Sequence, residues 1–141
     1  MKFWDSSALV PLLLDESQSE SMIRLLREDP DLVTWWGTSI ECVSAVRRRE
    51  REGILSAEST RDALEFLRTL TDEWTEVLPS TRLKFHASRL MATHPLRAAD
   101  SIQLAAAIAW RADPTSRPEF VCLDDRLTDA ASREGFSCIP A

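Results

Sequence analysis

Glycine and histidine are scarce in this sequence, and their scarcity excludes two common kinds of active site. The 141 residues include three glycines, Gly37, Gly53 and Gly135. They are isolated from one another, so no glycine-rich loop is present to cradle the phosphates of a nucleoside triphosphate. The two histidines, His86 and His94, have no partner pattern of the Ser-His-Asp type. We therefore expect neither a nucleotide-triphosphate enzyme nor a catalytic triad, and we expect both histidines to be structural or solvated.

Cysteine is also scarce, and no long apolar run is present. The three cysteines, Cys42, Cys122 and Cys138, are far apart, odd in number and without metal-ligand spacing, which predicts buried thiols in a reducing compartment. The apolar stretch Leu9 to Leu14 is too short to span a bilayer. Asp5 interrupts the apolar start of the chain, which argues against a signal peptide. We therefore expect a cytoplasmic protein with no membrane partner.

The composition is that of one acidic domain. A length of 141 residues is usual for a single domain, and 44% hydrophobic residues suffice for one core, so we expect one domain over residues 1–141. The net charge of -6 argues against a general nucleic-acid coat or a membrane-surface binder. A polyanionic substrate would therefore have to be met by local positive charge.

Short apolar runs alternate with amphipathic stretches along the chain. The expected strands are 2–4, 32–35, 74–78, 119–123 and 136–139, and the expected helices are 8–14, 16–28, 40–52, one that Ser56 caps, 81–92, 98–110 and 125–134. Strands that alternate with helices predict an α/β fold, a parallel sheet with helices on both faces. The first strand is apolar throughout its short length, so we place it at the centre of the sheet.

Four acidic residues stand where predicted strands give way to helices or in the first turn of a predicted helix: Asp5, Glu41, Asp100 and Asp124. Each has a simpler explanation as a helix cap, as part of a capping box over 38–41, or as a charge that complements a helix dipole. All four would, however, face the same edge of the sheet, where like charges repel and some would take up protons unless a cation is present. Oxygen ligands without histidine or cysteine favour Mg²⁺ or Mn²⁺, which activates water for chemistry at phosphorus.

These residues lie within longer motifs: DSSALV at 5–10, Glu41, HPLRAADSIQLA at 94–105 and FVCLDDRL at 120–127. The set resembles the PIN-domain ribonucleases of the VapC toxin type, in the family's order and over essentially the whole chain. The resemblance implies a three-layer α/β/α PIN-like domain around a central parallel sheet. It also implies a Mg²⁺- or Mn²⁺-dependent endoribonuclease that acts as the toxin of a toxin-antitoxin pair, with RNA as substrate. The implied protein partner is a cognate antitoxin whose tail occupies the active-site groove.

The resemblance assigns roles residue by residue. Asp5, Glu41, Asp100 and Asp124 fall on the family's acidic quartet, and Ser6 falls on the hydroxyl that supports the first aspartate. We infer that Asp5, Asp100 and Asp124 hold one ion, with Glu41 orienting a second ion or the attacking water. Water, not a side chain, is the expected nucleophile.

The chain departs from the family at two places near these ligands. Gln103 stands where many relatives have His, and Cys122 stands where many have Ser or Thr. Neither departure removes a ligand, so the implied metal site stays complete.

Arginines near the quartet are candidates for RNA binding. Arg97 precedes Asp100 by about one helical turn. Arg47 belongs to an arginine-rich run after Glu41, in which interleaved glutamates are equally compatible with a solvated face or an antitoxin contact.

Several apolar residues allow two interpretations. Trp35 and Trp36 suit base stacking or the core. The run Leu9 to Leu14, with Met22 and its apolar neighbours, suits ordinary core packing or a surface for an antitoxin or a second copy. We expect a homodimer.

Two alternative functions can be distinguished from the nuclease by residues that each would require or lack. A non-catalytic PIN-like module that binds RNA or protein would lack an acidic residue of the quartet. A receiver-type phosphoacceptor domain would need an aspartate after the third strand and a lysine near the end of the chain. That strand is followed by Pro79 and Ser80, and the lysines are Lys2 and Lys84. Ser7 likewise breaks the Asp-x-Asp pattern of a phosphatase nucleophile.

Overall fold

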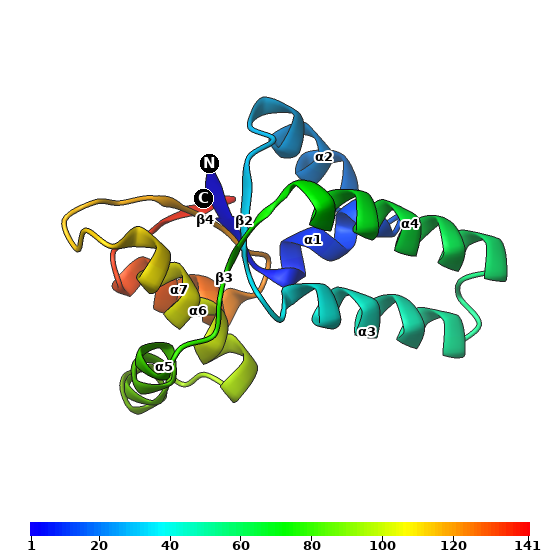
Figure 1. Cartoon of the computed structure of the whole chain (residues 1–141). Helices are drawn as coiled ribbons and strands as arrows, with labels where there is room; N and C mark the ends of the chain where they lie inside the picture. The colour runs from blue at the N-terminus through cyan, green and yellow to red at the C-terminus, as the bar shows by residue number, and fades with distance from the viewer.

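Five short parallel strands form one sheet at the centre of the molecule (Figure 1). The computed structural model describes residues 1–141. The strands are β1 (Lys2–Trp4), β2 (Leu32–Trp35), β3 (Thr75–Val77), β4 (Glu119–Val121) and β5 (Ser137–Ile139). Their order is β3-β2-β1-β4-β5, and every neighbouring pair is parallel. The predicted α/β class with a central parallel sheet is confirmed, and β1 lies at its centre as predicted.

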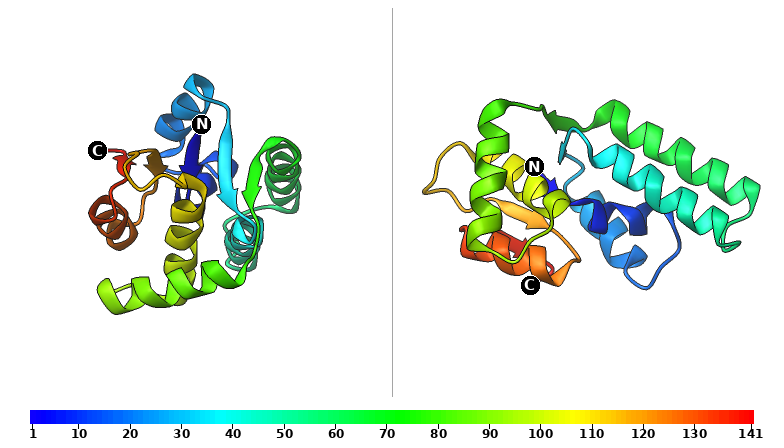
Figure 2. Two further views of the ribbon diagram at one scale, coloured as in Figure 1. Left: turned by 60° about the vertical axis from the view of Figure 1, so that its left-hand side comes forward. Right: turned by 90° about the horizontal axis from the view of Figure 1, so that it is seen from below.

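Seven helices cover the two faces of the sheet, which gives three layers (Figures 1 and 2). They are α1 (Ser6–Leu13), α2 (Ser19–Glu28), α3 (Thr38–Arg51), α4 (Ala57–Glu73), α5 (Thr81–Thr93), α6 (Ala98–Arg111) and α7 (Asp125–Arg133). Helices α1 to α4 pack on one face, and α5 to α7 on the other. No helix combines the length and the apolar character needed to cross a membrane.

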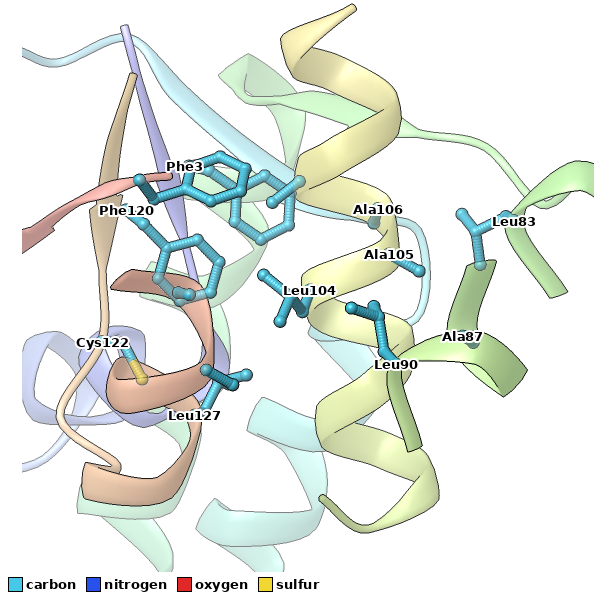
Figure 3. Packing of buried hydrophobic residues seen from close by; sticks show 14 of the residues in the cluster. Phe3, Leu83, Ala87, Leu90, Leu104, Ala105, Ala106, Phe120, Cys122 and Leu127 are labelled. Carbon is cyan, nitrogen blue, oxygen red and sulfur yellow. The ribbon is translucent and has the colours of Figure 1, made fainter. Parts of the chain in front are cut away.

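The central strands are buried on both faces, because successive side chains of a strand point in opposite directions. Phe3 and Phe120 point toward α5 to α7 and stack with their ring centroids 5.4 Å apart (Figure 3). Trp4 and Val121 point toward α1 to α4. All four side chains are fully buried. This two-sided burial accounts for the apolar character of the strands.

Helix α6 is the buried helix that its small residues predict. Leu104 and the three alanines that follow it, Ala105, Ala106 and Ala107, are fully inaccessible to solvent. Figure 3 shows Leu104 beside Phe3 and Phe120, while Ala105 and Ala106 lie toward α5. The small alanine side chains let α5 pack closely across α6 (Figure 2).

The starts of two helices differ from the prediction. We expected the first helix to begin at residue 8, but Asp5 is its cap, with a carboxylate that accepts the Ser7 N–H at 3.0 Å. The helix therefore begins at Ser6. The capping box over 38–41 is also wrong, because Gly37 precedes α3 without any side-chain cap. The Glu41 carboxylate is thus free for other contacts.

The boundaries of other helices and strands differ from the prediction by a few residues. Helix α2 begins at Ser19, not at Glu16, because Ser19 Oγ accepts the Glu16 N–H at 2.8 Å and donates to the Leu14 carbonyl at 2.7 Å, which makes a turn there. Strand β4 ends at Val121, and β3 is confined to 75–77. The side-chain hydrogen bonds of Ser19, which the periodicity does not encode, set the start of α2.

Several residues with two interpretations belong to the core. Leu9, Leu12 and Met22 are buried together, so core packing accounts for the apolar run that could have formed a partner surface. His94 is buried, and its Nε2 lies 2.8 Å from Glu134 Oε2, as expected of a structural histidine.

Candidate functional site

A polar hollow of about 470 Å³ opens beside the carboxyl ends of β1 and β4. Its lining includes Asp5, Ser6, Glu41, Asp100 and Asp124. The structure thus brings the four predicted carboxylates and the supporting serine to one place, from four separate segments of the chain. This is the edge of an open α/β sheet at which ligands bind.

Asp5 and Asp124 reach the hollow from neighbouring strands. The Asp5 N–H donates to the Val121 carbonyl at 2.9 Å, which holds the end of β1 against the end of β4. Asp5 caps α1, and Asp124 caps α7 by accepting the Leu127 N–H at 2.9 Å. The capping interpretation of both residues is therefore correct, and it coexists with their place in the hollow. Each cap fixes one carboxylate at the entrance of a helix.

Glu41 is held from both sides. Its Oε1 accepts a hydrogen bond from Gln103 Nε2 at 2.7 Å, and its Oε2 accepts one from Ser6 Oγ at 3.3 Å. These two donors confine a long side chain that would otherwise rotate freely. The predicted support of Asp5 by the Ser6 hydroxyl is therefore wrong: Ser6 supports Glu41, and Asp5 accepts the Ser7 N–H instead.

Gln103 is the contributor that the quartet pattern missed. It is buried, and it follows Asp100 by three positions along α6, so both residues lie on the same side of that helix. The i, i+3 spacing from Asp100 was the available signal. This spacing does not predict the contact with Glu41, because that contact depends on how α6 packs against α3.

Burial and like charge raise the pKa of three of the four carboxyl groups. Burial raises the pKa of Asp5, and the negative charge of Asp100 adds to that effect. Burial also raises the pKa of Glu41, with Asp5 adding to it and the hydrogen bond from Gln103 opposing it. For Asp100, burial and the charge of Asp124 raise the pKa, while Arg97 and Arg126 oppose the rise. The hollow therefore concentrates negative charge that favours a proton or a cation.

The donor set fits a hard divalent cation, although the side chains are not gathered around one point. No group of three or more His, Cys, Asp or Glu side chains is arranged to hold a metal ion. Hydrogen bonds from protein donors hold Asp5, Glu41 and Asp124 in separate positions. Anionic oxygens are nevertheless the ligands that Mg²⁺ and Mn²⁺ prefer, and a cation would relieve the repulsion.

Cys122 occupies the second departure from the family pattern, next to Asp5. Its Sγ lies 3.6 Å from Ser7 Oγ and 3.7 Å from Asp5 Oδ2. Burial raises the pKa of Cys122 to about 12, with the Asp5 charge adding to it. The thiol therefore stays protonated and acts as a weak donor to Asp5. The Cys122 thiol is thus a neutral hydrogen-bonding group beside Asp5.

The two predicted RNA-binding arginines have different surroundings. Arg97 precedes α6 and is close enough to Asp100 to lower the pKa of that carboxyl. Arg47 is not part of the hollow, because its Nη1 pairs with Glu50 at 3.0 Å beside α4. Arg48, the next residue, lines the hollow and makes no ion pair. The arginine-rich run thus contributes a different residue from the one predicted.

Comparison with known proteins does not identify this chain: no protein-family model matches it, and no curated protein is similar to it at a significant level. Its function is therefore inferred from its residues and their geometry.

Proposed function

We propose that this protein is a metal-dependent endoribonuclease of the PIN type, the toxin of a toxin-antitoxin pair, that hydrolyses RNA phosphodiester bonds with a metal-activated water. The observation that carries the proposal is the convergence of Asp5, Glu41, Asp100 and Asp124 on one hollow at the ligand-binding edge of a parallel sheet. Four like charges are costly unless a cation neutralises them. Burial is the main cause of the raised pKa of three of these groups, and the negative charge of their neighbours adds to it.

The residues divide into ligands, orienting groups and phosphate contacts. Asp5, Asp100 and Asp124 would hold Mg²⁺ or Mn²⁺, which when bound lowers the pKa of water and offsets charge on the phosphate oxygens. Glu41, fixed by Gln103 and Ser6, accepts a hydrogen bond from the attacking water and so orients it.

Positive charge beside the hollow would hold the substrate. Arg48 on α3 and Arg97 at the start of α6 offer guanidinium groups to the phosphate oxygens. An acidic protein needs such local contacts, because its overall charge repels RNA.

The antitoxin rests on the resemblance to VapC-type toxins, whereas the homodimer was expected from the apolar run at Leu9 to Leu14, much of which is buried in the core. The open hollow would admit the tail of a protein partner as well as RNA. Inhibition of cleavage by a co-expressed neighbouring gene product tests the first partner, and light scattering of the purified protein tests the second.

One observation favours a second candidate function. Asp5 and Asp124 accept hydrogen bonds from the protein, and no group of side chains is arranged to hold a metal ion. Both features are expected of a non-catalytic PIN-like module that binds RNA or protein. This alternative predicts RNA or protein binding without cleavage.

The deciding experiment measures cleavage of structured RNAs with Mg²⁺, Mn²⁺ or EDTA. Asp100→Asn is the test variant, and Asp72→Asn, an exposed aspartate of α4, is the control for the loss of one charge. Metal-dependent cleavage that Asp100→Asn abolishes and Asp72→Asn retains supports the nuclease. No cleavage in any metal, together with no metal binding by calorimetry, overturns it in favour of the binding module.

A further inference from the structure

A second hollow, of about 580 Å³ and mainly apolar, lies between the end of β2 and the helices α5 and α6. Its walls include Trp36, Leu83, Ala87, Met91 and Ile102. The volume is within the range of small-ligand sites, roughly 300–1,000 Å³. We call it the tryptophan groove. None of the four carboxylates lines it.

Trp36 gives this groove an exposed aromatic surface. Its side chain is 48% exposed although Trp is a large apolar residue. Trp35 supports it edge-on, with ring centroids 6.3 Å apart and ring planes at 72°. Gly37 makes room for that support, because a Cβ at this position would lie 2.6 Å from Trp35 Nε1. The local sequence therefore holds an indole ring at the surface.

Helix α5 brings positive charge to the same groove. Its sequence, 81–93, contains Arg82, Lys84 and Arg89 and no acidic residue, in a chain whose net charge is -6. Lys84 is the one charged residue that lines the groove, and it makes no ion pair. Arg89, in contrast, pairs with Glu134 at 3.3 Å. The groove thus pairs an apolar wall with an unneutralised cation.

The tryptophan groove adjoins the acidic hollow through two segments. In the first turn of α6, Ala98 and Ser101 line the groove while Asp100 lines the acidic hollow. Trp36 is separated from the start of α3, which carries Glu41, by Gly37 alone. A chain bound in the groove would therefore continue toward the carboxylates.

We propose that the tryptophan groove binds an unpaired nucleotide of single-stranded RNA next to the bond that is cleaved, with its base on Trp36 and a phosphate at Lys84. This inference rests on the proposed nuclease function and names the form of its substrate. An aromatic face stacks on a base only when the base is free of its partner strand, and lysine meets a phosphate as a point charge. The charge of Lys84 favours a polyanion over an apolar protein segment.

The test measures binding of a fluorescent single-stranded oligoribonucleotide in EDTA, where cleavage is absent, and of the same sequence as a duplex. Trp36→Ala should weaken single-strand binding roughly tenfold, and Trp36→Phe should restore most of it. Lys84→Gln should weaken it about threefold and reduce the salt dependence by about one phosphate contact, whereas Lys84→Arg should not. Duplex binding should change little.

Matched controls lie on α4, on the other face of the sheet. Phe66→Ala removes an exposed aromatic ring, and Arg61→Gln removes an exposed cation. Neither should alter RNA affinity. Because Trp36 and Lys84 are exposed, all variants should unfold at similar temperatures, which thermal denaturation checks.

Two outcomes overturn the proposal for the groove. One is single-strand affinity that neither Trp36→Ala nor Lys84→Gln changes, in a protein whose cleavage Asp100→Asn still abolishes; the nuclease then stands without this subsite. The other is a dimer that Trp36→Ala converts to a monomer with unchanged RNA affinity, which makes the groove a contact between copies. Absence of both RNA binding and cleavage would instead remove the proposed function itself.

Discussion

Gln103 on α6 and Glu41 on α3 are joined by a hydrogen bond of 2.7 Å from Nε2 to Oε1. The same Nε2 donates to Thr38 Oγ1 at 3.1 Å, so one buried amide ties α6 to the first turn of α3. Asp100 lies one turn before Gln103. The separation of Glu41 from Asp100 therefore depends on this amide.

Replacing Gln103 by Leu should lower the free energy of unfolding by about 1–3 kcal/mol, because Glu41 and Thr38 lose a donor in a buried setting. The lower part of this range is expected, since Gln103 Oε1 itself has no partner. Loss of the bond should also raise the pKa of Glu41. Urea denaturation measures the change, with Gln18→Leu at an exposed position as the control. Equal effects of the two changes would contradict the structural role of Gln103.

Asp100→Asn should stabilise the metal-free protein at neutral pH by a few degrees in Tm. Burial and Asp124 raise the folded-state pKa of Asp100 above its ordinary 3.8, so ionisation disfavours the folded state. The advantage of Asn should be absent well below pH 3.8, grow as the pH rises above it, and level off once the folded-state carboxyl is ionised. Thermal melts across this pH range measure it, and a constant difference at all pH values would disagree with the proposed repulsion.

Added Mg²⁺ or Mn²⁺ should raise the Tm of the wild-type protein. An ion that binds only the folded state contributes about 2.7 kcal/mol at roughly one hundred times its dissociation constant, equivalent to roughly 5–10 °C for a domain of this size. EDTA should reverse the shift. The gain should be small in Asp5→Asn and unchanged in Asp72→Asn. A gain of equal size in all three proteins would point to ion binding elsewhere.

Arg48→Gln should reduce RNA cleavage more than Arg47→Gln does, by about three- to tenfold in kcat/KM. Arg48 lines the acidic hollow and is unpaired, whereas Arg47 is paired with Glu50. The effect should be mainly on KM, because a phosphate contact away from the reacting bond binds substrate and transition state alike. The two variants have the same charge, which controls for long-range electrostatics. A larger loss in Arg47→Gln would restore the sequence-based assignment.

Gly37→Ala should lower stability by about 1–3 kcal/mol and weaken binding in the tryptophan groove. The new methyl group would lie 2.6 Å from Trp35 Nε1 and displace the indole that supports Trp36. Gly53→Ala is an informative comparison, because open space surrounds Gly53 but its φ of +76° strains any side chain. Thermal melts report both variants. RNA affinity should fall in Gly37→Ala alone.

The sequence predicts the order and type of the elements because the spacing of its apolar residues distinguishes strands from helices. The run Phe3 to Trp4 is too apolar for an edge strand, and Ala105 to Ala107 suit only a buried helix; both expectations are confirmed. Helix starts were less accurate. Asp5 and Ser19 each accept a backbone N–H group near the start of a helix. A neighbouring polar side chain could have accepted the same N–H group, so tertiary contacts decide which residue accepts it.

The position of the candidate site follows from topology, but its contacts do not. Parallel strands bring their carboxyl ends to one edge, which is sufficient to place Asp5 and Asp124 together. The bond from Gln103 to Glu41 depends on the packing of α6 against α3, and the direction of Arg47 and Arg48 depends on the rotation of α3. Sequence spacing predicts the helix face on which a residue lies, but it does not predict which residue of another helix that side chain contacts.

The central place of β1 also governs when the hollow can form. This strand pairs on one side with β4, which is made from the last quarter of the chain, through Phe3 and Phe120. A ribosome-bound chain that has not yet released residues 119–124 can complete neither the sheet nor the carboxylate set. Contacts between such distant segments slow folding, since a long loop must close before any pairing energy is gained. During synthesis, the carboxylates of Asp5, Glu41 and Asp100 therefore leave the ribosome before the strand that completes the hollow with Asp124.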